Sequence, residues 1–477
     1  MIPLEVWLVV SLQVVLGFAD VVVHHELIAR LPWRSGAAPE LRLHGARNLV
    51  YAVIFLTLAW VVPLGWTALI LAGLLLAEAT ITFADWIVEH SSRPLPASER
   101  VLHGLLAINF GVLLALLAPI VWQWLREPAS VEFVVRGVWS WLATVAAAGL
   151  LAMAIRDFAA ARRVDGFRTR SLSLDLPDRQ RWLVTGGTGF VGRRLTEALA
   201  GDGHEVTVLT RDVKRAQLLS APFRVVTSLD QIDATQGFDV VVHLAGEPVA
   251  AGPWTPVRRQ RIERSRPELA RRLIQLIRRL EAKPKVLIGA SAVGWYGDRG
   301  EAVLDEGADF EDCFAHRSCE AAEIASAEAE QDGVRVVMLR IGLVLGREDG
   351  LLAQLLTPFD LGFGARLGSG RQWMSWIERD DLVRLIAFAS TQEAIRGSVN
   401  AVAPHAVTNS VFTCALARAL RRPAWFALPR VLLVGVLGDM ARELMLASQR
   451  AVPAKVLDNG FEFRFPEIDA ALAKALS

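Results

Sequence analysis

The chain has 477 residues, 53% of them hydrophobic, and its 51 lysines and arginines nearly balance its 50 aspartates and glutamates. This length predicts two or three domains, and a formal net charge of +1 gives no reason to expect a nucleic-acid partner. The hydrophobic fraction is too high for a soluble protein of this size, and the excess lies before residue 160. The composition therefore predicts a membrane domain joined to a soluble domain.

Five segments in the first third of the chain are long enough and apolar enough to cross a bilayer. They are residues 2–23, 41–62, 66–88, 101–124 and 138–155. Arginines gather after the first, third and fifth segments, and the positive-inside rule places such loops in the cytoplasm. We therefore expect an all-α transmembrane bundle over 1–158, multi-pass in the inner (cytoplasmic) membrane, with the rest of the chain in the cytoplasm.

The predicted membrane domain contains an internal repeat. The sequence ADVVVHHE at 19–26 recurs as ADWIVEHS at 84–91, and ELRLHG at 40–45 recurs as ERVLHG at 99–104. This pattern indicates a duplicated helical hairpin. The predicted topology places the acids and histidines of both copies at the cytoplasmic ends of four helices.

Carboxylates and histidines together are the ligand mixture of di-iron and di-manganese sites in helical bundles. Glu40 and His44 stand four residues apart, as do Glu99 and His103, so each pair shares one helix face. We predict a site for iron, manganese or another transition metal. The predicted ligands are Asp20, His25, Glu40, His44, Asp85, His90, Glu99 and His103, with His24, Glu78 and Glu89 around them. Two alternatives stay open: a haem held by two histidines, or polar helix ends that only cap and snorkel.

After the membrane domain, residues 159–180 are charged and aperiodic, which indicates a juxtamembrane linker. A doubly wound α/β pattern then begins. Strands are expected at 182–185, 205–209, 224–226, 240–244, 286–290 and 334–339, with helical stretches between most of them. The pattern predicts a Rossmann-like parallel sheet.

The sequence TGGTGFVG at 185–192 joins the first of these strands to a helical pattern, in the spacing of a dinucleotide-binding turn. Gly186 permits the turn, Gly189 lets the backbone approach a pyrophosphate, and Gly192 lets helix and strand pack closely. The helix N-terminus then faces the phosphate charge. The predicted cofactor contacts are Gly186, Gly187, Thr188, Gly189, Phe190, Val191 and Gly192, joined by Leu244, Ala245 and Gly246 after the fourth strand.

The end of the second strand favours NADP over NAD. An acid at this point would bind the ribose 2′-hydroxyl, but the chain has Thr210 and Arg211, and an arginine accommodates a 2′-phosphate. The alternative is a solvated basic turn, because the adjacent Asp212 weakens the signal.

Longer motifs follow in a characteristic order. They are HLAGEPVAAGPW at 243–254, SAVGWYGDRG at 291–300, GSGRQWMSWI at 368–377 with DDL at 380–382, and NAVAP at 400–404. With TGGTGFVG, they resemble the atypical extended short-chain dehydrogenase/reductase family of nucleoside-diphosphate-sugar epimerase-like proteins, and the tail resembles that family's C-terminal domain of unknown function. The resemblance covers about 181–477. It implies an NADP-binding Rossmann domain over 181–405 and a small α+β substrate or accessory domain over 406–477.

The catalytic pair of the wider superfamily is missing from the chain. Standard members use a serine with Tyr-x3-Lys for proton exchange during hydride transfer. Here the only tyrosines are Tyr51, in the membrane domain, and Tyr296, and no lysine stands between Lys285 and Lys455. The standard pair therefore cannot be built.

Other residues occupy the matching positions. The resemblance places His316 and Glu320 where the tyrosine and lysine would stand, and Ser291 at the serine position. We predict that His316 is the acid/base group and that Glu320 favours its charged form, with Ser291 and Tyr296 completing the catalytic site. The alternative is an ordinary ion pair on a helix surface.

These features predict a membrane-anchored NADP-dependent oxidoreductase or epimerase that acts on a small carbonyl or sugar-like substrate. One alternative is an NADP-binding sensor or docking module without turnover. Another is an electron supplier to a metal-dependent enzyme formed by the membrane helices. The expected partners are a small-molecule substrate and the lipid bilayer.

Overall fold

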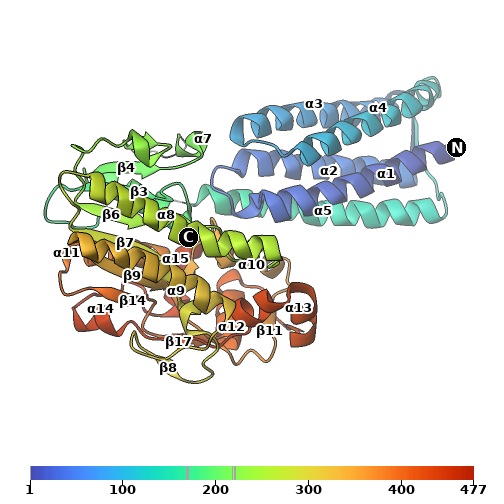
Figure 1. Ribbon diagram of the computed structural model, residues 1–477. Coiled ribbons are helices and arrows are strands. Elements are labelled where there is room, and N and C mark those ends of the chain that lie inside the picture. Colours follow the sequence, from blue (N-terminus) through green and yellow to red (C-terminus); the bar gives the residue numbers. More distant parts are fainter. Residues whose placement is uncertain (1, 168–170, 218, 220–221) are drawn as a thin grey trace. The chain divides into compact units, whose positions relative to one another are not determined.

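The computed structural model describes residues 2–167, 171–217, 219 and 222–477 (Figure 1). The chain forms two compact units, which comprise residues 1–168 and 169–477.

The first unit is helical. Within the described residues, five helical segments are long and apolar enough to cross a membrane, and they coincide with the five predicted segments. Their helices are α1 (Leu4–Asp20), α2 (Ala38–Trp60), α3 (Ala68–Ser92), α4 (Ala97–Leu125) and α5 (Val138–Asp165). The helix α1 continues as the π-helix η1 (Val21–Ile28), and short 3-10 turns follow at η2 (Leu31–Trp33) and η3 (Gly65–Thr67). The strands β1 (Val61–Leu64) and β2 (Ser130–Phe133) pair antiparallel at the ends of α2 and α4.

The helical unit carries large apolar side chains on its outside and buries several polar ones beside its apolar core. Outward positions include Leu8, Phe18, Leu76 and Ile87, which are 56%, 70%, 69% and 72% exposed. The buried residues include Gln13, Glu78 and Asn109. A soluble protein shows the opposite distribution, and an apolar exterior is expected where lipid surrounds the helices.

The helix α5 extends beyond its predicted end at residue 155 and finishes at Asp165. Its last turns pack against the loop after η1, where Ala160, Ala161 and Val164 share an apolar cluster with Leu31 and Leu41. The first residues of the predicted linker 159–180 are therefore helical, because small side chains on one face let this end of α5 pack.

The second unit is built on a seven-stranded parallel sheet. Its strands are β3 (Arg181–Thr185), β4 (Glu205–Leu209), β5 (Arg224–Val226), β6 (Val240–His243), β7 (Val286–Ala292), β9 (Arg335–Ile341) and β14 (Gly397–Ala401). The strand order is β14-β9-β7-β6-β3-β4-β5. The order reverses between β3 and β6, and α/β sheets bind ligands at such a switch point. All six predicted strands are present; β14 was not predicted, because GSVNA has neither an apolar run nor clear alternation.

Helices cover both faces of this sheet. Successive residues of its central strands point to opposite sides, and because they are apolar on both sides, each face has to be buried. One core joins α6 (Phe190–Gly201) and α11 (Arg379–Thr391) to the sheet, and it includes Val184, Val242, Ile288, Leu195 and Ile386. The other core lies under α8 (Pro256–Arg279), and it includes Leu183, Val241, Leu287, Leu273 and Ile277. The remaining helices are α7 (Val213–Ala216), α9 (Phe314–Ala327), α10 (Gly350–Asp360), α12 (Asn409–Leu420), α13 (Arg430–Leu437), α14 (Ala454–Asp458) and α15 (Ile468–Leu476).

Residues 406–477 belong to the same compact unit as the sheet. Short two-stranded pairs connect them to it: β15 (Val407–Thr408) with β12 (Trp373–Met374), β16 (Phe426–Leu428) with β11 (Ala365–Leu367), and β17 (Arg450–Ala451) with β8 (Val303–Leu304). A further pair joins β10 (Leu343–Leu345) to β13 (Trp376–Glu378). Phe461 packs into the core under α11. The tail is therefore joined to this unit by main-chain pairing with short strands outside the seven-stranded sheet and by apolar contact with the core.

Candidate functional site

The turn between β3 and α6 is shaped by glycines. Gly186 has a φ of 73°, and a Cβ there would lie 2.8 Å from the backbone nitrogen of Ala245. A Cβ on Gly192 would lie 2.1 Å from the carbonyl oxygen of Gly186, and one on Gly187 would lie 2.8 Å from the Val208 side chain. These positions therefore exclude any side chain, as a turn that brings backbone close to a pyrophosphate requires.

The N-terminus of α6 is available to an anion. Gly189 is its N-cap, no side chain caps it, and Phe190 and Val191 begin its first turn, whose N–H groups lack partners inside the helix. The Thr188 hydroxyl lies 3.3 Å from that of Thr210 and so links the turn to the end of β4.

Buried contacts hold α6 in place. The guanidinium of Arg194 donates two hydrogen bonds to Asp380, at 2.6 and 3.0 Å, and both residues are buried. The motif DDL therefore positions the helix, a role that the sequence did not reveal. The Phe190 ring packs against Gly346: a Cβ added to Gly346 would lie 2.6 Å from the Cζ atom of Phe190.

Arg211 is exposed at the end of β4 and forms no ion pair with any residue that the structure describes. The neighbouring Asp212 caps α7, since its Oδ1 atom accepts the backbone N–H of Arg215 at 3.0 Å. The acid that weakened the sequence signal is therefore used locally, and the arginine is available to a phosphate.

The loop after β6 lies against the glycine turn. The backbone N–H groups of Leu244 and Ala245 donate to Thr185, at 3.1 Å to its carbonyl and 3.4 Å to its hydroxyl. His243 lies 2.9 Å from the same hydroxyl through Nδ1, and burial lowers its pKa to about 4. This histidine is neutral and ties the strand ends together.

Gly246 faces a residue that the sequence analysis missed. A Cβ on Gly246 would lie 2.6 Å from the Cζ atom of Arg266, so the guanidinium packs directly on this loop. Arg266 is one of nine arginines in α8. Only the orientation of the helix distinguishes it from the others.

Ser291 lies at the end of β7 and begins a chain of buried polar contacts. Its hydroxyl donates to Glu323 at 2.6 Å, and the carboxylate of Glu323 accepts two hydrogen bonds from Arg340, each at 3.1 Å. The guanidinium of Arg340 stacks 3.5 Å from the centre of the Trp295 ring. Glu323 stands seven residues after His316 in α9, and that helical spacing is the signal that could have identified it.

His316 is buried and oriented. Its Nδ1 atom lies 2.6 Å from the Trp295 carbonyl oxygen, and since a carbonyl only accepts, Nδ1 carries the proton. Phe310 stacks on the ring with centroids 3.8 Å apart, and Nε2 lies 3.8 Å from the Glu320 carboxylate. The histidine of this i,i+4 pair is therefore buried and fixed in orientation, while its partner Glu320 is half exposed.

Tyr296 is predicted to complete the catalytic site, and in the structure it lies in the interior of the second unit. Its side chain is fully buried, and its hydroxyl lies 2.8 Å from Asn400 Oδ1 and accepts from Arg340 at 3.2 Å. Burial raises the pKa of this hydroxyl. These contacts commit the Tyr296 hydroxyl to partners in the interior of the protein and assign it no proton exchange with a substrate.

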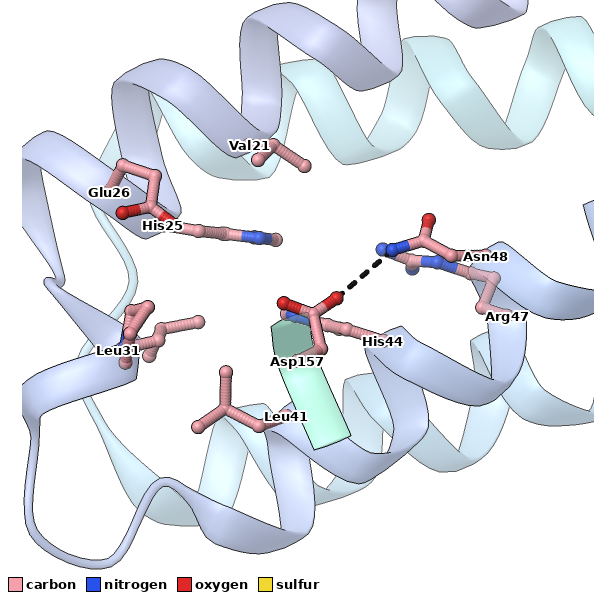
Figure 2. A pocket seen from close by; sticks show the side chains of 10 residues that line it. Val21, His25, Glu26, Leu31, Leu41, His44, Arg47, Asn48 and Asp157 are labelled. Carbon is pink, nitrogen blue, oxygen red and sulfur yellow. Dashed lines mark hydrogen bonds between the residues drawn. The ribbon is translucent and has the colours of Figure 1, made fainter. Parts of the chain in front are cut away.

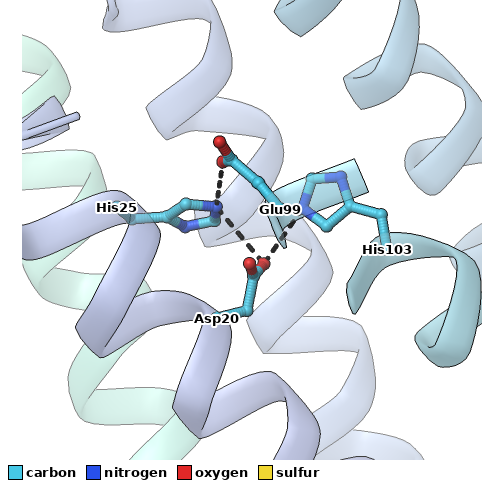
Figure 3. Close-up of side chains that lie close together, drawn as sticks. All are labelled: Asp20, His25, Glu99 and His103. Atoms are coloured by element: carbon cyan, nitrogen blue, oxygen red, sulfur yellow. Dashed lines mark hydrogen bonds and ion pairs between the residues drawn. The ribbon is translucent and has the colours of Figure 1, made fainter. Parts of the chain in front are cut away.

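In the helical unit, four predicted metal ligands converge (Figure 3). Asp20, His25, Glu99 and His103 each offer one ligand atom, and these atoms all lie within 4.8 Å of one another. The Nε2 atoms of His103 and His25 lie 3.1 and 3.3 Å from the Asp20 carboxylate.

The other four predicted ligands are not part of this group of four. His44 and Arg47 contact Asp85 at 3.1 and 3.0 Å, and Glu40 accepts from Arg93 at 3.0 Å. His90 is exposed and does not join the four residues that converge. The repeat is asymmetric because α1 turns into a π-helix before His25, whereas α3 stays α-helical through His90, and a π-turn rotates the residues that follow it.

A pocket adjoins this cluster (Figure 2). It is lined by Val21, His25, Glu26, Leu31, Pro32, Leu41, His44, Arg47, Asn48 and Asp157. The rings of His25 and His44 stack with centroids 4.4 Å apart, and Asn48 donates to Asp157 at 3.0 Å across the pocket. His25 therefore borders the pocket as well as the carboxylates of Asp20 and Glu99.

Comparisons with known proteins match the second unit. A model of the NAD dependent epimerase/dehydratase family matches residues 182–401, and a domain of unknown function, DUF1731, matches residues 428–475. An Arabidopsis thaliana protein named as a chloroplastic homolog of epimerase family protein SDR39U1 is 36% identical over 296 residues, which is 61% of this chain and 84% of that protein. The epimerase family protein YfhF of Bacillus subtilis is 34% identical over 62% of this chain and 97% of its own length.

Solved structures agree with this. Human epimerase family protein SDR39U1, whose crystal structure contains NADPH, is 31% identical and aligns with a TM-score of 0.56 over 62% of this chain and 99% of that one. A nucleoside-diphosphate sugar epimerase from Corynebacterium glutamicum is 30% identical, with a TM-score of 0.51 over 72% of this chain and 67% of that one.

Proposed function

The chain belongs to the NAD dependent epimerase/dehydratase family, and from this premise we propose that it is an NADP(H)-dependent oxidoreductase or epimerase anchored in a membrane by its five apolar helices. Its substrate is a small carbonyl compound or a sugar-like alcohol. The observation that carries the proposal is the glycine turn, in which Gly186 and Gly192 exclude side chains beside the open N-terminus of α6.

NADP(H) rather than NAD(H) is supported by two observations. The human relative with the matching fold was solved with NADPH. In this chain Arg211 lies exposed where the 2′-phosphate would be bound, and Asp212 caps a helix instead. The turn 186–192, Thr210 and the loop 244–246 would hold the rest of the cofactor.

The proton chemistry is assigned to His316. NADP(H), when bound, supplies or accepts the hydride. The Trp295 carbonyl fixes the proton of His316 on Nδ1, so Nε2 can take a proton from a substrate hydroxyl or, once charged, return it to a carbonyl oxygen. Glu320, 3.8 Å from Nε2, stabilises the charged ring.

Ser291 orients the substrate in this proposal. Its own hydrogen is donated to Glu323, which Arg340 holds in place, so the serine oxygen is left to accept a hydrogen bond from a substrate hydroxyl. This arrangement replaces part of what the missing tyrosine and lysine would do.

Membrane anchoring rests on the helical unit. Five apolar helices with large apolar side chains on their outer faces are the arrangement that lipid favours. By the positive-inside rule, the arginines after the first, third and fifth helices support a cytoplasmic location for the nucleotide-binding unit.

The proposal is tested with the full-length protein in detergent and NADPH that carries deuterium at the transferred position. Small aldehydes, ketones and nucleotide sugars are screened for the movement of deuterium out of the nicotinamide. We expect transfer with at least one class and its loss in the His316→Gln variant. Tight NADPH binding without any hydride exchange would instead support the sensor.

A further inference from the structure

We propose that Asp20, His25, Glu99 and His103 bind one divalent first-row transition-metal ion inside the helical unit (Figure 3). This inference does not depend on the function proposed for the nucleotide-binding unit. It also revises the predicted di-metal site to a single ion with four ligands.

The four side chains come from two regions of the bundle and meet in its interior. Asp20 ends α1, His25 lies in the π-helix η1, and Glu99 and His103 stand one turn apart in α4. The carboxylates are 2% and 0% exposed, and His25 is 4% exposed. Two imidazole nitrogens and two carboxylate oxygens suit Fe²⁺, Mn²⁺ or Zn²⁺, and they lack the sulfur that Cu⁺ prefers.

His25 supplies an independent observation. Its Nε2 atom is buried and makes no hydrogen bond, although it lies 3.3 Å from Asp20 and 3.8 Å from Glu99. A buried polar atom without a hydrogen bond costs free energy, and in the tautomer whose proton is on Nδ1 the Nε2 lone pair is repelled by two carboxylates unless a cation lies between them. A metal ion resolves both conflicts.

Neighbouring groups orient the proposed ligands. The Nδ1 atom of His24 lies 2.8 Å from Asp20 Oδ1, which leaves Oδ2 for the metal. The Nδ1 atom of His103 faces Glu89 at 3.4 Å, and its Nε2 atom faces Asp20. Metal-binding histidines usually donate their second N–H to a carboxylate in this way. Glu78, which is predicted to lie around the ligands, accepts hydrogen bonds from Tyr51 and Thr82 through Oε1.

The charge balance also favours a cation. Besides Glu26, which pairs with Arg156, and Asp157, which accepts a hydrogen bond from Asn48, five carboxylates are buried in this part of the bundle: Asp20, Glu40, Asp85, Glu89 and Glu99. Two guanidinium groups, those of Arg47 and Arg93, form ion pairs with them. The remaining negative charge must be met by protonated histidines or by a metal, and histidines that bind a metal are neutral.

Arg93 explains why one ion fits better than two. Its guanidinium contacts Glu89 at 2.5 Å, Glu99 at 2.6 Å and Glu40 at 3.0 Å. It therefore occupies the place among these acids that a second ion would take. Each oxygen of Glu99 keeps a second lone pair for the proposed metal.

The test uses the full-length protein in detergent. Metal is removed with a chelator, Mn²⁺ is titrated back under anaerobic conditions, and the free ion is followed by its electron paramagnetic resonance signal. We expect one Mn²⁺ per chain, and the same stoichiometry in elemental analysis for the transition metal that the untreated protein carries.

Matched variants locate the site. We expect His25→Gln combined with His103→Gln to lose the bound Mn²⁺, and His24→Gln to weaken its binding about 10- to 100-fold. His90→Gln, the exposed counterpart in the other repeat, should bind as the unchanged protein does. Asp20→Asn tests the site again if the double variant unfolds, and NADPH affinity reports on the integrity of the other unit.

Two results would overturn the proposal. One is a stripped wild-type protein that takes up no stoichiometric Mn²⁺ or Zn²⁺, or that carries a haem absorption band instead. The other is a folded Asp20→Asn or double-histidine variant that binds Mn²⁺ as tightly as His90→Gln.

Discussion

The two units encode their sites in different ways. In the nucleotide-binding unit, the phosphate cradle is a backbone structure, because Gly186 and Gly192 matter for the side chains that they lack. In the helical unit, the polar cluster consists of side chains that come from four segments. Arg93 and the histidines lie between its carboxylates. A site made of backbone requires steric room in one short segment, whereas a buried cluster of charged side chains requires that positive and negative charges balance. The first should fail through steric overlap and the second through uncompensated charge.

Arg93→Gln should have the largest effect. It leaves three buried carboxylates, those of Glu40, Glu89 and Glu99, without their shared cation. Breaking a buried ion pair on one side costs about 3 to 5 kcal/mol. Thermal unfolding of the helical unit in detergent, followed by circular dichroism, should show the loss, and NADPH affinity should be unchanged. The control is Arg100→Gln, an exposed arginine of α4. Equal stability of the two variants would contradict the charge-balance account.

Gly192→Val tests the opposite kind of site. Its Cβ would overlap the Gly186 carbonyl at 2.1 Å, and backbone on both sides leaves no flexible neighbour to move. We expect NADPH binding to weaken by about 3 kcal/mol or more, since overpacking of this kind costs 1 to 3 kcal/mol even where side chains can adjust. Gly201→Ala in the same helix is the control, because a Cβ there meets nothing within 4 Å. Fluorescence titration with NADPH separates the two variants.

The same difference explains what could be predicted from the sequence. The glycine spacing and the apolar runs are local patterns, so the cradle, the parallel sheet and the five helices were predicted, with β4 and β5 at their observed bounds. Arg266, Glu323 and Arg340 were missed, because only tertiary packing selects them among many charged residues. The exposure of His90 was missed because the π-helix lies only in the first repeat. It rotates His25 inward relative to His90, and no spacing rule indicates where a π-helix forms.

The His316→Gln variant tests whether the nucleotide-binding unit also depends on a side chain, in addition to its glycine turn. Loss of the proton-exchanging Nε2 should lower turnover about a hundredfold or more, while NADPH affinity stays nearly intact. Glu320→Gln is the companion variant and should cost less, because its carboxylate lies 3.8 Å away and is half exposed. Steady-state kinetics with the substrate class from the deuterium screen would check both. Unimpaired turnover in His316→Gln would remove this histidine from the mechanism.

Arg211→Ala probes the side chain that is proposed to bind the 2′-phosphate of the cofactor. Loss of a charged hydrogen bond should weaken NADPH by about 1.5 to 3 kcal/mol and leave NADH nearly unchanged, since NADH has no 2′-phosphate. Arg215→Ala, on the short helix that Asp212 caps, serves as the neighbouring basic control. An equal loss for both nucleotides would mean that Arg211 acts on general affinity.

Tyr296→Phe should have the smallest effect, and it separates a buried polar contact from a catalytic one. The hydroxyl lies 2.8 Å from Asn400 Oδ1 and 3.2 Å from Arg340, in a site that water does not reach. Its removal leaves partners unpaired and should cost about 1 to 3 kcal/mol of stability. Turnover should stay within about twofold, because proton exchange is assigned to His316. Thermal unfolding and kinetics measured on the same preparation decide the matter. A large loss of turnover at unchanged stability would return Tyr296 to the catalytic site. A loss of stability at unchanged turnover would show that the contacts of Tyr296 stabilise the fold. This unit would then bury a structural polar network, as the helical unit does.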